Sequence, residues 1–387
     1  MKVYFGKPDI GEEEVHAISE VIRSKWIGQG AKSQEFENNF SAYVNAEHAK
    51  STNCCTSALH ICLHLLNIKK DDEVITSSLT YAATAKAIEW MGATPVLVDI
   101  DPLTFNIDAS KISNSITKKT KAIVPVHFGG MPCDLSTIYN IAANFDIDVI
   151  EDAAHAAGAE FNNTKIGGFG NSLTCFSFHP NKNMTSIEGG MITTSNLEHA
   201  RNIEKLRLLG FNSNSWNVYS NEKEKYPEVT DSGFRYNMND INAAVGIVQL
   251  KKLPASNQIR EKHAAIYDSY LSQLECITIQ SRNVSNAQIK HAFHLYAMCM
   301  HENQFTCKRE QILHELREEG ILVGIQYKPV HKHPYFKEIV AYNPDTLNVT
   351  EYVGRNIFSL PLGPSYTEQE IIWTAETLTR ILKSKLK

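Results

Sequence analysis

The sequence predicts an α/β fold in which a large domain with a mostly parallel sheet, residues 1–250, precedes a smaller α+β domain, residues 251–387. Three observations support this prediction. The chain has 387 residues, which is too long for one small module. From Lys50 onward, short apolar runs typical of strands alternate with runs typical of helices, which favours βαβ units. From about Pro254 the composition becomes more polar and mixed, which indicates a second domain.

Two helices are expected before the alternating region. Segment 11–24 has apolar residues at helical spacing, namely Val15, Ile18, Val21 and Ile22. A loop with the sequence SKWIGQG follows. We expect a second helix to begin at Ser33, because a serine hydroxyl is a favoured N-cap and Glu35 places a negative charge in the first turn.

The alternating region predicts the sheet. The expected strands are DEVITS (72–77), TPVLVDI (94–100), KAIVPVHF (121–128) and DIDVIEDA (146–153). The expected helices of this region lie at 57–67, before the first of these strands, and at 82–92 and 135–145, between later ones. The run 74–77 carries no charge, as a strand buried on both faces requires.

The remaining elements are less regular. A strand or hairpin is expected at 188–195, and helices at 197–209 and 240–253. After Pro254 we expect a separate long helix at 257–274, strands at 291–300 and 321–327, a helix at 309–320 and a terminal helix that begins near Glu368.

Composition excludes several classes of protein. The formal net charge is −5 and the pI is about 6.3, so the chain lacks the positive charge of a nucleic-acid binder. No apolar stretch approaches the roughly 20 residues that span a bilayer, and the N-terminus has no apolar signal core, so we expect a cytoplasmic protein without membrane association. The eight cysteines are scattered without a CxxC pair, which favours neither a metal site nor a disulfide framework.

The segment 149–191 carries the chemistry. Asp152 ends an apolar strand, and Lys182 follows thirty residues later in a segment rich in glycine, hydroxyl and amide groups. Pyridoxal phosphate (PLP) needs such a pair, because a lysine forms a Schiff base with its aldehyde and an acid holds its ring nitrogen protonated. Taken singly, Asp152 is more often a helix N-cap and Lys182 a solvated charge.

Two motifs in this segment resemble those of the DegT/DnrJ/EryC1/StrS sugar aminotransferases, a branch of the fold-type I (aspartate aminotransferase-like) PLP enzymes. The strand motif is EDAAH (151–155), and the lysine motif is SFHPNK (177–182) followed by EGG (188–190). The resemblance covers essentially the whole chain, from the WIGQG loop to the SLPLGPSYT segment near residue 359. It implies an aspartate aminotransferase-like fold with a seven-stranded, mostly parallel sheet.

The resemblance also implies roles for individual residues around the cofactor. Lys182 would form the Schiff base and Asp152 would face the pyridine nitrogen. Ser177 and Thr56 would bind the phosphate together with a helix N-terminus, where Cys55 stands in place of the usual glycine. Tyr81 would stack on the ring, and His155 would lie near its phenolic oxygen. Without the resemblance, Tyr81 would be assigned to the core and 53–60 to an amphipathic helix.

Other residues are implied by the family's dimer and its substrate. The motif at 233–242 implies a homodimer with shared active sites, in which Asn237 reaches the partner's cofactor phosphate and Arg235 binds an anionic ligand. The residues implied on the sugar-nucleotide side are Tyr327, His331, Trp26, Ile27 and Gly28. No metal is implied.

The implied activity is a ping-pong transamination through Lys182. An amino group would pass from L-glutamate to pyridoxamine phosphate, and then to a nucleotide-linked 4-keto or 3-keto sugar, in the biosynthesis of amino sugars for lipopolysaccharide or other surface glycans. Two alternatives stay open. A sugar dehydratase of the same family carries histidine at the lysine position, and a non-catalytic regulatory relative would not need the intact set of Asp152, Ser177 and Lys182.

Overall fold

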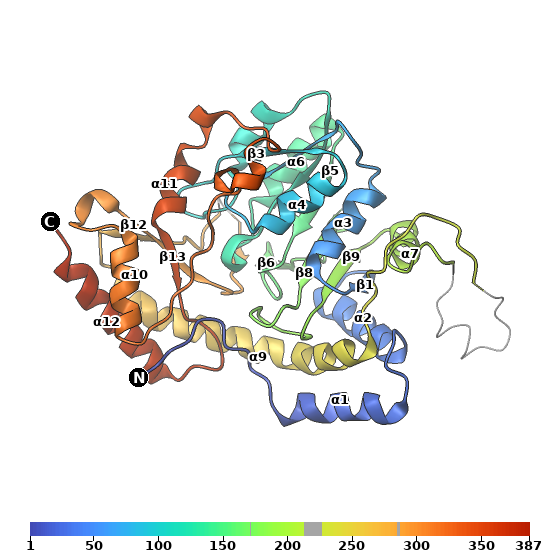
Figure 1. The fold of residues 1–387 in the computed structure, drawn as a ribbon, viewed down its shortest axis with the longest axis horizontal. Helices are drawn as coiled ribbons and strands as arrows, with labels where there is room; N and C mark the ends of the chain where they lie inside the picture. Colours follow the sequence, from blue (N-terminus) through green and yellow to red (C-terminus); the bar gives the residue numbers. More distant parts are fainter. Residues whose placement is uncertain (171, 213–226, 285–286) are drawn as a thin grey trace.

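A seven-stranded sheet forms the centre of the large domain (Figure 1). The computed structural model describes residues 1–170, 172–212, 227–284 and 287–387. In the order β1-β9-β8-β5-β4-β2-β3, the strands are β1 (His48–Thr52), β9 (Gly190–Thr194), β8 (Leu173–Ser177), β5 (Asp148–Asp152), β4 (Thr120–Val124), β2 (Glu73–Ser77) and β3 (Thr94–Val98). Only β9 runs against its neighbours in this sheet, so the predicted mostly parallel sheet is confirmed.

Helices cover both faces of this sheet. One core lies against α3 (Cys55–Leu65), α4 (Ala82–Trp90) and α7 (Leu197–Leu206). The other lies against α2 (Ala31–Val44), α5 (Ala109–Ile112), α6 (Leu135–Phe145) and the first half of α9 (Asp240–Leu271). In β5, Val149 belongs to the second core and Ile150 to the first, because successive side chains of a strand point to opposite faces. This explains why the strand is apolar throughout its middle.

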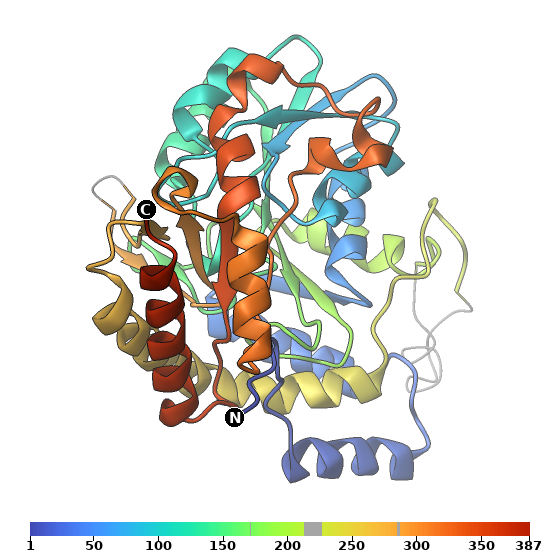
Figure 2. The same cartoon turned by 60° about the vertical axis from the view of Figure 1, so that its left-hand side comes forward.

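The long helix α9 corrects the prediction of two helices separated near Pro254. The helix is 32 residues long and continues through Pro254 without a break. It runs across the lower part of the molecule in both views (Figures 1 and 2). Its first part packs against α1 (Glu12–Ser24) and α2, and its later part against α12 (Glu368–Ser384). These long-range contacts outweigh the backbone hydrogen bond that a proline removes. The predicted boundary between residues 250 and 251 therefore falls inside one helix.

The smaller C-terminal part combines a sheet and helices. Its antiparallel sheet has the order β10 (Ile277–Ile279), β12 (Tyr296–Met300), β13 (Ile357–Leu360), and its helices are α10 (Arg309–Glu318), α11 (Asn348–Asn356) and α12. The strand expected at 321–327 was wrong, since this segment makes only the isolated bridges Val3–Ile321 and Gly324–Ser359. A third sheet joins the two parts, because β11 (Ile289–Lys290) pairs with β6 (Glu160–Phe161), which pairs with β7 (Thr164–Lys165).

Short 3₁₀ turns complete the described chain at Ser113–Ser115, Phe128–Gly130, Glu302–Gln304, Val330–Lys332, Pro334–Phe336 and Pro344–Thr346. Among the described helices, none combines the length and the apolar character that crossing a membrane requires. The eight cysteines are all free thiols.

The start of α2 shows how a distant residue replaces the predicted cap. The helix begins at Ala31 with Gly30 as its N-cap, so Ser33 lies inside it. Asp240 Oδ1 accepts hydrogen bonds from the Gly30 and Ser33 backbone N–H groups, at 2.8 and 2.9 Å, and from the Ser33 hydroxyl at 2.7 Å. A carboxylate from α9 therefore satisfies the donors that a local cap would have satisfied.

Candidate active site

A cavity of about 310 Å³ opens at the edge of the large sheet where the parallel strands end. Ligands of open α/β sheets bind at this edge. The predicted residues that line the cavity are Cys55, Thr56, Tyr81, Asp152, His155, Ser177, Lys182 and Tyr327. They come from α3, from the loop before α4, from the ends of β5 and β8 and the loops that follow these strands, and from the segment after α10.

Asp152 is the last residue of β5 and is 4% exposed. Its Oδ2 accepts a hydrogen bond from the Thr84 hydroxyl at 2.8 Å, and its Oδ1 accepts one from the Ala154 backbone N–H at 3.1 Å. Burial raises the pKa of the carboxyl, while the Thr84 and Ala154 hydrogen bonds and the charge of Lys182 oppose that rise. A buried carboxylate with two fixed donors and room beside it is suited to hold a cationic ring.

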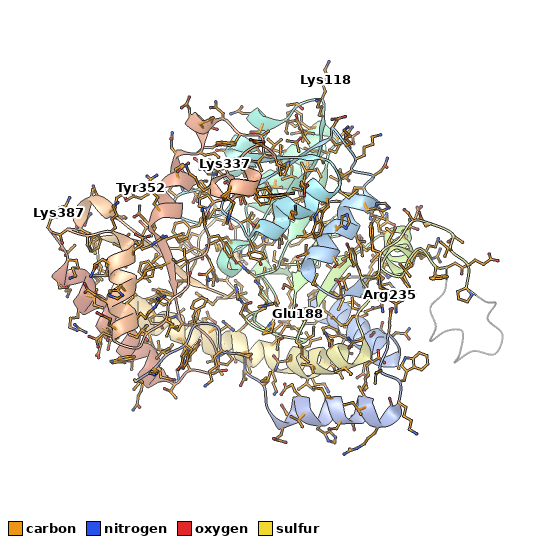
Figure 3. All side chains as sticks on the ribbon, in the orientation of Figure 1. Lys118, Glu188, Arg235, Lys337, Tyr352 and Lys387 are labelled. Carbon is orange, nitrogen blue, oxygen red and sulfur yellow. The ribbon has the colours of Figure 1, made fainter. Side chains whose placement is uncertain are left out.

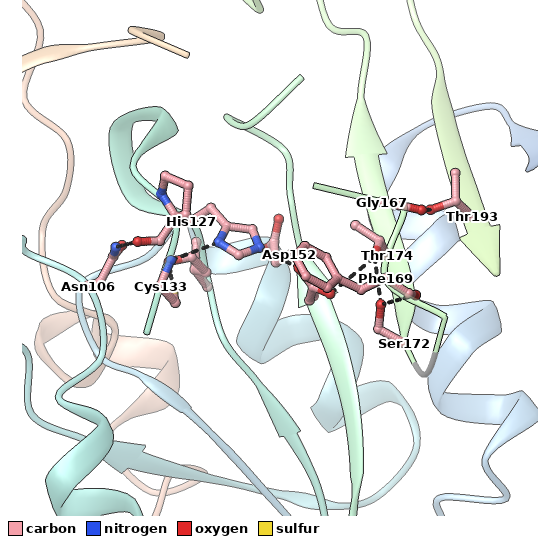
Figure 4. A network of polar contacts seen from close by, with 12 residues as sticks. Asn106, His127, Cys133, Asp152, Gly167, Phe169, Ser172, Thr174 and Thr193 are labelled. Carbon is pink, nitrogen blue, oxygen red and sulfur yellow. Dashed lines mark hydrogen bonds and ion pairs between the residues drawn. The ribbon is translucent and has the colours of Figure 1, made fainter. Parts of the chain in front are cut away.

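A second buried network supports the strand behind Asp152 (Figure 4). The preceding residue, Glu151, accepts hydrogen bonds from the Tyr139 hydroxyl at 2.5 Å and from His127 Nε2 at 2.8 Å. His127 Nδ1 accepts the Cys133 backbone N–H at 3.0 Å, so the ring proton must reside on Nε2 and point at Glu151. Burial would raise the pKa of Glu151, but the hydrogen bonds from His127 and Tyr139 lower it overall.

Lys182 lies in the loop between β8 and β9, and neighbouring bonds fix this loop. The Thr185 hydroxyl donates to the Phe178 carbonyl at 3.0 Å, and Asn183 Nδ2 donates to the Ala292 carbonyl at 2.6 Å. Burial lowers the pKa of Lys182 from 10.5 to about 8, against the raising effect of negative charge at Cys55 and Asp152. Burial also raises the pKa of the Cys55 thiol far above its usual value, so this thiol is neutral at physiological pH. The negative charge beside Lys182 therefore comes from Asp152 alone.

The N-terminus of α3 forms one wall of the cavity. Cys54 is the N-cap, and its Sγ accepts the Ser57 backbone N–H at 3.4 Å. Cys55 is the first helical residue, so its backbone conformation does not require the glycine that is usual at this position. The side chains of Thr56 and Ser177 complete a set of neutral donors that suits a phosphate.

His155 and Tyr327 form another part of the cavity lining. His155 Nδ1 accepts the Gly129 backbone N–H at 3.2 Å, so its Nε2 carries the proton and donates to the Tyr327 hydroxyl at 3.0 Å. Burial lowers the pKa of His155 well below its usual value, which keeps the ring neutral. The Tyr81 ring is 63% exposed and its centroid lies 5.8 Å from that of Tyr327, so one face of Tyr81 is free to stack on a ligand.

The other predicted residues do not line this cavity. Arg235 is exposed and Asn237 half-buried on a segment that packs beside α3, where the Asn53 backbone N–H donates to the Tyr236 carbonyl at 2.7 Å (Figure 3). His331 is buried, with Nδ1 2.6 Å from the Ser78 hydroxyl and Nε2 2.8 Å from Glu351. The loop residues that were predicted to meet the sugar lie at the surface before α2: Trp26 is half-buried, and Ile27 and Gly28 are exposed.

Sequence reasoning missed several lining residues, among them the polar residues Thr84, His294 and Gln326. His294 is 6% exposed, its ring lies 4.3 Å from that of His155, and its Nδ1 has no hydrogen-bond partner among the described residues. A histidine within the strand-like run 291–300 was the available signal. Thr84 and Gln326 gave no signal, because only tertiary contacts bring them to the cavity.

Comparison with known proteins identifies the family. The DegT/DnrJ/EryC1/StrS aminotransferase family matches residues 8–379. The chain belongs to this family. It is 39% identical over 381 residues to the spore coat polysaccharide biosynthesis protein SpsC of Bacillus subtilis, covering 98% of this chain and 97% of SpsC.

Solved structures extend this result to the fold and the cofactor. Spr1654 from Streptococcus pneumoniae, named as a sugar aminotransferase and solved in PLP and PMP forms, superposes in its PLP form with a TM-score of 0.90 at 29% identity over 100% of both chains. PseC from Helicobacter pylori, an aminotransferase of pseudoaminic acid biosynthesis, gives 0.90 at 28% identity over 99% of this chain and 100% of PseC. The chain is therefore a PLP-dependent aminotransferase with the PLP fold-type I architecture.

The cavity fits this cofactor on its own evidence. Asp152 offers a buried carboxylate to a ring nitrogen, Lys182 offers a primary amine to the aldehyde, and the start of α3 offers backbone donors to the phosphate. The assignment of individual residues to these contacts stays a prediction.

Proposed function

We propose that this aminotransferase moves the amino group of L-glutamate to a nucleotide-linked 4-keto sugar, with a 3-keto sugar as the second choice. The observation that carries the proposal is the joint placement of a buried Asp152 and a Lys182 of lowered pKa in one cavity. Bound PLP supplies an aldehyde that accepts the amino group and a protonated ring that withdraws electrons from the reacting carbon.

The protein's own residues divide the remaining work. Lys182 would hold the cofactor through its aldehyde, and its amine, once free, would be a positioned base for the proton on the donor's α-carbon; such a base contributes roughly 10²–10⁴-fold. The carboxylate of Asp152 keeps the ring nitrogen protonated. His155 stays neutral and, by its hydrogen bond, positions Tyr327 in the cavity lining.

Lys182 also separates this proposal from the two alternatives. The dehydratases of the family have no lysine at this position, and a regulatory protein would not need an amine in a buried cavity beside Asp152. SpsC and PseC are named for spore coat polysaccharide and pseudoaminic acid biosynthesis, which supports a role in the biosynthesis of a surface glycan such as lipopolysaccharide. We place the protein in the cytoplasm, where its eight free thiols would stay reduced.

The direct test is a panel of nucleotide-linked 4-keto and 3-keto sugars, each offered with L-glutamate. We expect an amino sugar and 2-oxoglutarate in equal amounts from one class of substrate, detected by mass spectrometry. Lys182→Ala should produce neither, although its fold is retained. Release of water from the sugar without amine incorporation would establish the dehydratase instead, and lack of a visible absorbance band from bound cofactor would favour the regulatory alternative.

We further propose a homodimer with shared active sites. Thr56, Ser177 and the start of α3 offer neutral donors to a phosphate that carries nearly two negative charges, so a donor from a second chain would complete the site. The segment with Arg235 and Asn237 is positioned at the surface beside α3, next to the exposed Trp90. An exposed tryptophan beside a polar segment is typical of an interface.

Subunit exchange tests this arrangement. Lys182→Ala and Asn237→Ala should each be inactive alone. In a mixed dimer one site carries both defects and the other carries neither, so about half of the wild-type activity per dimer should return. Absence of recovery after proven exchange would refute the shared site without affecting the proposed reaction.

A further inference from the structure

Two buried thiols meet where α3 packs against β8 (Figure 1). Cys62 Sγ and Cys175 Sγ lie 3.5 Å apart, and both side chains are fully buried. Both residues are free cysteines, and we call them the thiol pair. The sulfur–sulfur bond of a disulfide is about 2.05 Å long, so the two atoms would have to approach each other by about 1.5 Å to form one.

The thiol pair joins the two elements that offer side chains to the cofactor phosphate. Cys62 lies two turns along α3 from Cys55, on the same face of the helix, and Thr56 lies in the first turn. Cys175 lies in β8, two residues before Ser177. A bond between Cys62 and Cys175 would therefore tie the wall that carries Thr56 to the wall that carries Ser177.

The active-site cavity gives a small oxidant an approach to the thiol pair. Cys55 lines the cavity and belongs to the same apolar core as Cys62 and Cys175. A cofactor in the cavity would cover Cys55, and this approach would then be closed. Burial raises the pKa of the Cys175 thiol well above its usual value, and the neighbouring Cys62 and Cys55 add to the rise. Because a protonated thiol reacts slowly, the pair should persist as two thiols until an oxidant reaches it.

We propose that the thiol pair is a site of reversible oxidation, at which a peroxide converts Cys62 and Cys175 into a disulfide while the cavity is empty. Hydrogen peroxide transfers one oxygen atom to the first sulfur, which becomes a sulfenic acid, and the other oxygen leaves as water. The second sulfur then attacks the first, the sulfur–oxygen bond breaks, and this oxygen leaves as a second molecule of water. In total the two thiols lose two hydrogen atoms, and with them the two electrons that reduce the peroxide.

The disulfide would stabilise the apoenzyme. The two cysteines are 113 positions apart, and a bond that closes a long loop restricts the unfolded chain. The bond would also hold the two walls of the phosphate site together while no phosphate lies between them. In a reducing compartment the pair stays as two thiols, so the bond would mark exposure to peroxide. This proposal is independent of the identity of the sugar and of the amino donor.

The test measures mass and thermal stability rather than turnover. Apoenzyme and PLP-loaded enzyme are treated with hydrogen peroxide, alkylated and digested with trypsin without reductant. Cys62 lies in the tryptic peptide 51–69 and Cys175 in the peptide 166–182. We expect these two peptides to be joined, with the loss of two hydrogen atoms, and to appear faster in the apoenzyme than in the PLP-loaded enzyme. The thermal midpoint of the oxidised apoenzyme should rise by about 5 °C or more, and a thiol reductant should reverse the rise.

Variants assign the bond, because the peptide 51–69 also contains Cys54 and Cys55. Cys62→Ala and Cys175→Ala should each lose the joined peptides and the rise in thermal midpoint. The matched control is Cys55→Ala, on the same face of α3, which should keep both. Joined peptides in Cys62→Ala, their loss in Cys55→Ala, or wild-type peptides that only gain oxygen atoms would overturn the proposal. Equal rates of oxidation with and without PLP would also overturn it, because the cavity would then not be the route.

Discussion

The lowered pKa of Lys182 predicts an unusually reactive amine in the apoenzyme. The difference between 10.5 and about 8 corresponds to roughly 3 kcal/mol against the charged form. At pH 7.5, roughly a quarter of the Lys182 side chains should be neutral, against about one in a thousand for an ordinary lysine. The physical cause is burial, and the carboxylate of Asp152 opposes it. Asp152→Asn should therefore lower the pKa of Lys182 further and increase the neutral fraction.

A suitable assay follows Schiff-base formation between apoenzyme and salicylaldehyde from pH 6 to 10. Salicylaldehyde has neither a phosphate nor a ring nitrogen, so changes at Asp152 affect its reaction through the amine alone. We expect an inflection near pH 8 in the wild type, and one at lower pH in Asp152→Asn. Lys182→Ala gives the background from other lysines, and Asp148→Asn, at the exposed start of the same strand, is the matched control. A wild-type inflection near pH 10.5, or the same shift in both Asp→Asn variants, would refute the reasoning.

Three further predictions concern buried charges. Asp152→Asn should weaken PLP binding by roughly 10- to 10³-fold in an absorbance titration, because the amide cannot hold the ring proton; unchanged affinity would show that another acid faces the nitrogen. Arg207→Met leaves the buried Glu37 carboxylate without the guanidinium that lies 2.5 Å away. The free energy of unfolding, measured by urea titration, should therefore fall by about 3–5 kcal/mol. Adding Glu37→Gln to this variant should restore part of the lost stability. Folding lowers the pKa of Glu151 from its ordinary value of 4.5. The ionised Glu151 carboxylate therefore stabilises the folded state fully above pH 4.5, and this contribution is lost as the pH falls through the lower pKa of the folded state. Glu151→Gln should therefore flatten the acid limb of the stability profile, and an unchanged limb would assign acid unfolding to other groups.

The sequence predicted Asp152, Ser177 and Lys182 as site residues because they lie in short, contiguous motifs, and the fold brings them to one cavity. Asp152 ends an apolar strand, and the sheet edge where parallel strands end is fixed by the alternation of strands and helices. Lys182 and Ser177 lie within six residues of each other, on a loop and the strand before it, so locating one located the other. Most longer helices of the large domain and its strands β2, β3, β4, β5 and β9 were predicted for the same reason, since their apolar pattern is local, whereas β1, α5, β6 and β7 were not predicted.

Tertiary structure decided whatever depends on residues far apart in the chain. Asp240 caps a helix more than 200 positions earlier, and no local pattern marks a carboxylate that serves another helix. Pro254 was expected to separate two helices, yet packing at both ends keeps α9 continuous. Thr84, in the first turn of α4 after β2, reaches Asp152 at the end of β5 only because β2 and β5 belong to one sheet, with β4 between them. Hydrophobic period and motif spacing are properties of a chain segment, whereas hydrogen-bond partners and pKa shifts are properties of the folded surroundings, and only the fold brings those surroundings together.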